Sequence, residues 1–134
     1  IDAIDSFNPK LSFLAELIER RILTISSMGA ALRTDPTRIH AGRLEDVTVC
    51  PLARRLRKFL RRRNLPLDTW CVYSNEPVNP GHIQEPETSD VFDRGRPRRI
   101  LGSLPTLTGI FGLFIANEAL RMLLGDCFPA SQDK

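Results

Sequence analysis

Two features of the sequence could do chemistry: a dense basic segment and an acidic residue close to the start. Seven of the 19 Lys and Arg residues lie within residues 54–63, a segment without Asp or Glu. The other 12 basic residues are outnumbered by the 16 acidic residues, so the net charge of +3 is a local property of this segment. Such a local concentration of cations is typical of a surface that binds a polyanion.

The basic segment has the pattern of an amphipathic helix that begins at Pro51. Leu52, Leu56 and Leu60 recur at helical spacing and define an apolar face. The candidate nucleic-acid-binding residues lie on the opposite face and are Arg54, Arg55, Arg57, Lys58, Arg61 and Arg62. Phosphates that such a face neutralises release counterions, which favours binding to nucleic acid. The same face could instead lie on an anionic membrane, or be an ordinary solvated surface.

Asp5 is the second candidate, because it ends a short apolar segment at the start of the chain. Asn8-Pro9 predicts the entry of a helix, and the apolar run 22–25 predicts a strand that closes in the turn 26–31. Strand, helix and strand in this order predict a parallel βαβ unit. Ligands of such sheets bind beyond the carboxyl ends of the strands, where a carboxylate can hold a magnesium–nucleotide. The alternative is that Asp5 only caps a turn.

Two further strands and a long loop are expected in the middle of the chain. Residues 39–44 predict a short strand, and residues 69–74 predict a second one with Cys71 and Tyr73 on one face. Trp70 and Val72 then lie on the other face. Residues 77–99 are rich in Pro, Gly and polar side chains and predict a long flexible loop. This loop ends in a second basic cluster, formed by Arg94, Arg96, Arg98 and Arg99.

Residues 100–116 carry no charge and lead into a helix that Gly125 is expected to cap. The uncharged stretch is shorter than the roughly 20 apolar residues that a membrane span needs, and it contains Pro, Ser, Thr and Gly. We therefore expect a core helix or a dimer-interface helix. Gly109 and Gly112 would let a second backbone approach closely.

Length and composition exclude several classes of protein. A chain of 134 residues predicts a single domain, and 42% apolar and 26% charged residues are typical of a globular fold. Three widely spaced cysteines, at positions 50, 71 and 127, make neither a disulfide framework nor a metal knuckle, and suit a reducing compartment. We therefore expect a cytoplasmic location. The two histidines lack metal-ligand spacing, and no Gly-x-Ser-x-Gly nucleophile motif occurs.

The order of these segments resembles the ThiF/MoeB/HesA superfamily of ATP-dependent adenylating enzymes. The resemblance rests on residues 2–10 and on 26–30 with 33–39. Residues 51–57, 71–76 and 102–112 narrow it to the branch that cyclises threonylcarbamoyladenosine in transfer RNA. The fold class that it implies is α/β, a partial Rossmann-like fold with a parallel βαβ start, extra strands and a carboxyl-terminal hydrophobic helix.

This resemblance implies a dimeric enzyme that uses ATP and magnesium to turn the threonylcarbamoyl carboxylate into an acyl adenylate. Ring closure then releases AMP. Asp5 matches the magnesium-coordinating, catalytic acid of the superfamily, and Asp2, Asp5 and Ser6 are the expected cofactor-binding residues. The dimer contact would involve the final helix. Transfer RNA and ATP are the implied partners, and membrane association is the less favoured alternative.

Two departures from the superfamily pattern qualify this expectation. The paired Cys-x-x-Cys zinc ligands of the sulfur-carrier branch are missing, which favours transfer RNA over activation of a ubiquitin-like protein. The Gly-rich nucleotide loop does not occur in these residues. We therefore expect the carboxyl-terminal portion of a longer adenylating domain, inactive by itself. A non-catalytic module that binds nucleic acid or a membrane is the competing hypothesis.

Overall fold

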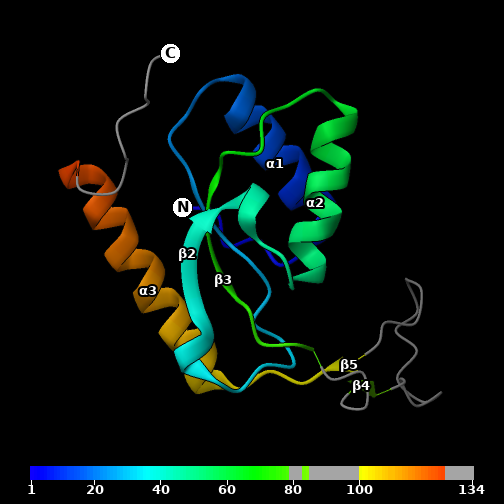
Figure 1. Ribbon diagram of the computed structural model, residues 1–134, viewed down its shortest axis with the longest axis vertical. Coiled ribbons are helices and arrows are strands. Elements are labelled where there is room, and N and C mark those ends of the chain that lie inside the picture. The colour runs from blue at the N-terminus through cyan, green and yellow to red at the C-terminus, as the bar shows by residue number, and fades with distance from the viewer. Residues whose placement is uncertain (79–82, 85–99, 126–134) are drawn as a thin grey trace.

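The computed structural model describes residues 1–78, 83–84 and 100–125, which form a mixed sheet with helices on both faces (Figure 1). Helices α1 and α2 cover one face, and α3 covers the other. The helices are α1 (Phe7–Glu19), α2 (Pro51–Arg62) and α3 (Pro105–Leu124). The strands are β1 (Ile25–Ser27), β2 (Ile39–Arg43), β3 (Trp70–Ser74), β4 (Ile83–Gln84) and β5 (Ile100–Leu101). Two short 3-10 helices flank β2, η1 (Pro36–Arg38) and η2 (Leu44–Asp46).

Strand β3 is the centre of the main sheet, whose order is β1-β3-β2. It pairs in parallel with β1, with Cys71 opposite Ser26, and antiparallel with β2, with Val72 opposite Ala41. Asp2 extends the sheet beyond β1 through a parallel bridge to Ser26. The predicted βαβ start is therefore present, with its first strand reduced to this bridge.

Each face of β3 has its own core, as the predicted alternation requires. Cys71 and Tyr73 pack with Leu14 of α1 and Leu56 of α2. Val72, on the other face, packs in the second core. The other buried residues of that second core are Ile25, Ile39, Leu107, Phe111, Ile115 and Met122. Partner elements on both faces fix the sheet between two helical layers.

The first helix begins and ends differently from the sequence prediction. It starts at Phe7 with Ser6 as N-cap, two residues before the predicted Asn8 cap, because Pro9 is tolerated anywhere in the first turn, where N–H groups have no helical partner. After the helix, Arg21 adopts a left-handed φ of 55° and exposes Ile22 and Leu23. The strand predicted from Ile22 therefore starts only at Ile25, and Ser26 and Ser27 belong to it instead of to a turn.

The helix α3 is only partly a core helix. Its inner face carries Leu107, Phe111 and Ile115, whereas Leu113 is 74% exposed and Leu123 78% exposed. Gly125 caps it with a left-handed φ of 84°, as predicted. Within the described part of the chain, α3 is the one helix long and apolar enough to cross a membrane by length and composition alone.

The predicted loop over residues 77–99 falls mostly outside the described residues. The part that is described includes β4, which pairs antiparallel with β5, so this segment contains a strand that the composition did not indicate. The second basic cluster, His82 and Cys127 also lie outside the described residues.

Candidate functional site

Asp5 lies where the sequence places it, directly after the Asp2 bridge and before α1. Its carboxylate is exposed, and within the described residues it forms no ion pair. Ser6 is the exposed N-cap of α1, and its hydroxyl makes no capping hydrogen bond to the helix. Both polar groups therefore face solvent at the carboxyl edge of the parallel strands, where ligands of such sheets bind.

Asp2 has a different environment from Asp5, because its carboxylate is used inside the protein. Its Oδ2 atom lies 2.7 Å from Lys10 Nζ and accepts a 2.6 Å hydrogen bond from the Ser26 hydroxyl. The Oδ1 atom accepts a 3.0 Å hydrogen bond from the Ile4 N–H. The side chains of Asp2 and Lys10 are both completely buried. The geometry therefore gives Asp2 an internal role and leaves Asp5 as the acid that can reach a ligand.

Sequence reasoning missed Lys10, although a signal for it existed. Lys10 stands four residues before Leu14, so helical spacing places it on the buried face of α1. A lysine on an apolar face needs a buried partner. Asp2 is that partner in the structure.

A second acidic residue, Glu76, ties two loops together at the same edge of the sheet. Its carboxylate accepts hydrogen bonds from the main-chain N–H groups of Thr34 (2.9 Å) and Asp35 (3.0 Å) and from the Thr34 hydroxyl (3.2 Å). The guanidinium of Arg33, which is 98% buried, donates to the main-chain carbonyl of Glu76. The end of β3 is thereby fixed to the segment that follows β1.

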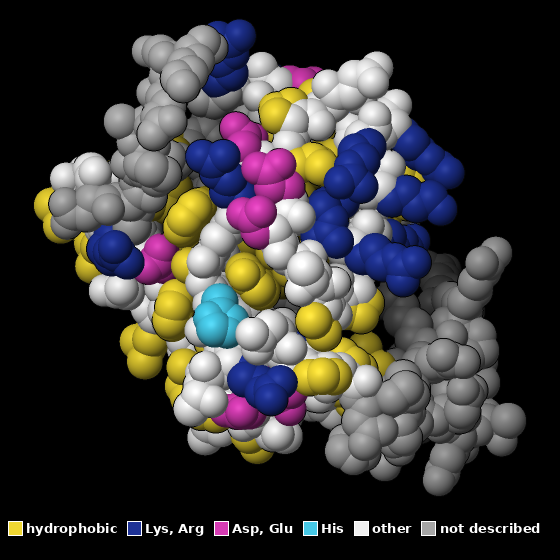
Figure 2. All heavy atoms as spheres, viewed as in Figure 1, with side chains coloured by type: hydrophobic (Ala, Val, Ile, Leu, Met, Phe, Trp, Pro, Cys, Tyr) yellow, Lys and Arg dark blue, Asp and Glu magenta, His cyan; other side chains and the backbone are white. Residues whose placement is uncertain are grey.

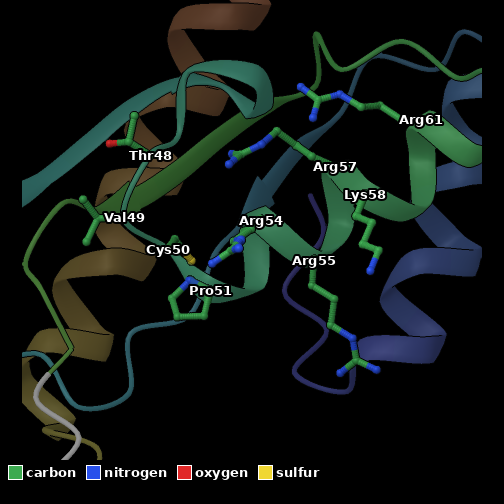
Figure 3. A pocket seen from close by; sticks show the side chains of 9 residues that line it. All are labelled: Thr48, Val49, Cys50, Pro51, Arg54, Arg55, Arg57, Lys58 and Arg61. Atoms are coloured by element: carbon green, nitrogen blue, oxygen red, sulfur yellow. The ribbon is translucent and has the colours of Figure 1, made fainter.

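The basic helix lines a groove. Figure 2 shows Lys and Arg side chains gathered on one side of the molecule, over α2. The groove has a volume of about 780 Å³ and runs from the loop before α2 along the helix (Figure 3). Its lining residues are Thr48, Val49, Cys50, Pro51, Arg54, Arg55, Arg57, Lys58 and Arg61. The lining contains no acid, so the groove suits an anionic partner.

The six predicted nucleic-acid-binding residues do not form one uniform surface. Arg57 is half-buried and donates hydrogen bonds to the main-chain carbonyls of Leu44 (3.0 Å) and Val47. Burial, together with the nearby charge of Arg61, lowers the pKa of Arg57. Its guanidinium therefore holds the loop after β2 against α2, which gives a structural reason for its place in the motif of residues 51–57.

Two more of these arginines lie against aromatic rings. The Arg55 guanidinium lies 3.8 Å from the centre of the Phe7 ring, and the Arg62 guanidinium lies 5.5 Å from the centre of the Phe59 ring. Arg55 borders the groove, and in Figure 3 its side chain points in the opposite direction from that of Arg57. Arg54, Lys58 and Arg61 are exposed and, within the described residues, pair with no acid. These three are the residues best placed to contact an anion in the groove.

Cys71 is a core residue. Its side chain is fully buried in the core beneath α1 and α2, and this burial raises the pKa of Cys71 to about 12. The thiol therefore stays protonated and out of reach of a substrate. No group of three or more His, Cys, Asp or Glu side chains among the described residues could hold a metal ion.

Comparisons with known proteins agree with this arrangement. The chain is 31% identical over 140 residues to "tRNA threonylcarbamoyladenosine dehydratase 1" of Saccharomyces cerevisiae, a match that covers 100% of the chain. It is 36% identical over 132 residues to "tRNA threonylcarbamoyladenosine dehydratase" of Bacillus subtilis, covering 94% of the chain. The chain is similar to one part of the tRNA threonylcarbamoyladenosine dehydratases. The resemblance seen in the sequence is thereby confirmed, although no family model matches.

Solved structures extend the similarity to the fold. The E. coli tRNA N6-threonylcarbamoyladenosine dehydratase in complex with ATP superposes with a TM-score of 0.71 over 98% of this chain, at 27% identity. The AMP complex of the same enzyme gives a TM-score of 0.69 at 25% identity. The predicted partial Rossmann-like, ThiF-type α/β fold is therefore confirmed.

The matches cover nearly all of this chain but only part of each longer relative. The chain spans 32% of the yeast relative and 50% of the Bacillus subtilis relative. It covers 49% of the E. coli chain that is bound to ATP. The chain therefore corresponds to half or less of each of these longer proteins.

The different environments of Arg57 and Arg61 predict different effects on stability. Replacement of Arg57 by Ala removes a charged donor from two carbonyls and should lower the free energy of unfolding by about 1.5–3 kcal/mol. The same replacement at exposed Arg61, one turn further on, should change it by less than about 0.5 kcal/mol. Urea unfolding of both variants measures the difference. Equal effects at the two positions would contradict the structural role of Arg57.

The hydrogen bonds at Glu76 predict a pH-dependent contribution to stability. Partial burial raises the pKa of Glu76, but the N–H groups of Asp35 and Thr34 outweigh it and leave this pKa below its ordinary value of 4.5. A carboxyl with a lowered folded pKa stabilises the fold above its unfolded pKa, and this stabilisation is lost as the pH falls through the folded value. Glu76→Gln should therefore be less stable than the parent at neutral pH, with a gap that closes on acidification below 4.5. Urea midpoints along a pH series test this, and a constant gap would refute it.

Proposed function

We propose that this chain contributes the carboxyl-terminal part of an ATP-dependent enzyme that acts on threonylcarbamoyladenosine in transfer RNA, in the cytoplasm. In the proposed reaction, an oxygen of the threonylcarbamoyl carboxylate attacks the α-phosphorus of ATP, and pyrophosphate leaves. An atom of the same threonylcarbamoyl group then attacks the acyl carbon, which closes the ring and releases AMP. Adenylation supplies the leaving group that a carboxylate lacks.

The observation that carries this proposal is Asp5 at the carboxyl edge of a fold shared with an ATP-bound enzyme. A single exposed carboxylate fits magnesium bound together with a nucleotide, since Mg²⁺ uses one or two carboxylates plus substrate phosphates. Bound in this way, the ion would neutralise phosphate charge as pyrophosphate departs. Asp5 would hold it, and the Ser6 hydroxyl, which makes no capping bond, would donate to the nucleotide.

The groove over α2 is the proposed contact for the transfer RNA backbone. Arg54, Lys58 and Arg61 supply exposed cations along one side of a single helix. Phosphate contacts of this kind position an RNA without reading its sequence. Arg55 and Arg62 add charge at the borders of this surface, where Phe7 and Phe59 hold their guanidinium groups.

The outer face of α3 is the proposed contact between two copies of the protein. Leu113 and Leu120 are exposed there, at 74% and 61%. A Cβ atom added at Gly109 or Gly112 would meet nothing within 4 Å, so the face is open to a second backbone. Burial of such an apolar patch favours association.

The catalytic proposal is tested in a chimera in which this chain replaces the segment that it matches in the Bacillus subtilis relative. Asp5→Asn should slow ATP–pyrophosphate exchange with substrate transfer RNA by a factor on the order of 100, because it removes the proposed metal ligand. The matched control is Asp68→Asn, the same change at an exposed acid in the loop before β3. Equal rates for Asp5→Asn and the parent chimera would rule out the proposed role of Asp5.

The groove is tested by filter binding of bulk transfer RNA to the 134-residue chain across a salt series. Arg54→Gln with Lys58→Gln removes two phosphate contacts and should reduce the slope of log K against log salt by roughly 1.5. Arg20→Gln with Arg21→Gln, which changes two exposed arginines at the end of α1, is the control. Equal reductions of the slope by both pairs would mean that the chain binds transfer RNA through its overall charge, and would contradict the proposed role of the groove.

A further inference from the structure

We infer that the buried Asp2–Lys10 pair is a positioning element that fixes the turn carrying Asp5. This inference rests on the proposed function, since it gives Lys10 a role toward the acid that would hold the metal. Lys10 Nζ lies 2.7 Å from Asp2 Oδ2, and both side chains are completely buried. The pair joins the beginning of the chain to the first turn of α1.

The pair contacts both main-chain polar groups of Ile4, the residue before Asp5. Asp2 Oδ1 accepts from the Ile4 N–H at 3.0 Å, and Lys10 Nζ donates to the Ile4 carbonyl at 3.3 Å. The carbonyl belongs to the peptide group that leads into Asp5, so its orientation sets the direction in which Asp5 leaves the sheet. The main chain before Asp5 is thus held from two sides by charged groups.

The cost of burying two charges indicates that the pair is there for geometry more than for stability. Desolvation of a buried ion pair can exceed its Coulombic gain, and apolar residues of similar volume often stabilise a fold as well or better. An apolar pair could fill the same space, but it could not bind the N–H and carbonyl groups of Ile4. Orientation of this peptide is what the charged pair adds.

Asp5 depends on this main-chain support because its own side chain receives none. It is exposed and, within the described residues, makes no ion pair or hydrogen bond. A ligand that approaches the edge therefore meets a carboxylate whose position is set by the backbone of residues 4–6. Groups that orient a metal ligand in this way typically change metal affinity by 10- to 100-fold, in order of magnitude, when they are removed.

The first test measures the turn itself in the 134-residue chain. A single Lys10 variant would leave the Asp2 charge buried and uncompensated, so Asp2→Leu and Lys10→Met are combined to remove both charges at similar volume. Hydrogen exchange followed by NMR should show the Ile4 amide exchanging faster by a factor on the order of 10, with the Val72 amide of the core much less affected. Ser26→Ala is the matched control, because the Ser26 hydroxyl donates to the same carboxylate and, within the described residues, makes no hydrogen bond to Ile4. Unchanged exchange at Ile4 in the double variant would overturn the inference.

The second test measures magnesium dependence in the chimera described above. The double variant should need about 10-fold more magnesium than the parent chimera for half-maximal pyrophosphate exchange. The single variant Lys10→Arg keeps Asp2 and a cationic donor, so its magnesium requirement should stay close to that of the parent. An unchanged magnesium requirement in the double variant, with Asp5→Asn slowed as expected, would overturn the positioning role and leave the proposed function intact. Full activity of Asp5→Asn would contradict both the proposed function and this inference, even if the Ile4 amide exchanged faster in the double variant.

Discussion

Strand β3 is paired along both edges and covered on both faces, and the positions of all three helices follow from this constraint. Cys71 and Val72 are adjacent, both fully buried, and point into different cores. One core needs α1 and α2, and the other needs α3. Because α1 and α2 share a face, the start of α1, which carries the Asp5 turn, and the basic helix lie on the same side of the molecule (Figure 1).

The position of α2 also explains how its cations are divided. Its apolar face is held by Leu56 and Leu60, which are completely buried, so the basic face must point outward. Arginine serves three purposes on that face: Arg57 binds main-chain carbonyls, Arg55 stacks on Phe7, and Arg54 lines the groove. The planar guanidinium, with its five donors, suits the first two of these contacts better than a lysine ammonium does, whereas the groove is lined by a lysine as well, Lys58. A raw count of positive charges therefore overstates what is available to a polyanion.

Features set by local periodicity could be predicted from the sequence. Helix α2, the two faces of β3 and the cap at Gly125 follow from spacing over a few residues. Contacts between distant residues could not be predicted in this way. The tie between Arg57 and the carbonyl of Leu44, and that between Glu76 and Thr34, depend on how loops meet in space. Lys10 lies between these cases: its helical spacing from Leu14 would have indicated a buried lysine, but not the identity of its partner.

The strand order has a consequence for the sequence of events in folding. Strands β1 and β2 come first along the chain, yet they do not pair with each other, because β3 lies between them. The three-stranded sheet therefore cannot assemble before residues 70–74 are available, and its parallel pair closes a long loop between Ile25 and Trp70. During synthesis, both outer strands must wait for the central one to leave the ribosome. A nascent chain that ends between residues 44 and 69 contains β1 and β2 without the strand that pairs with both.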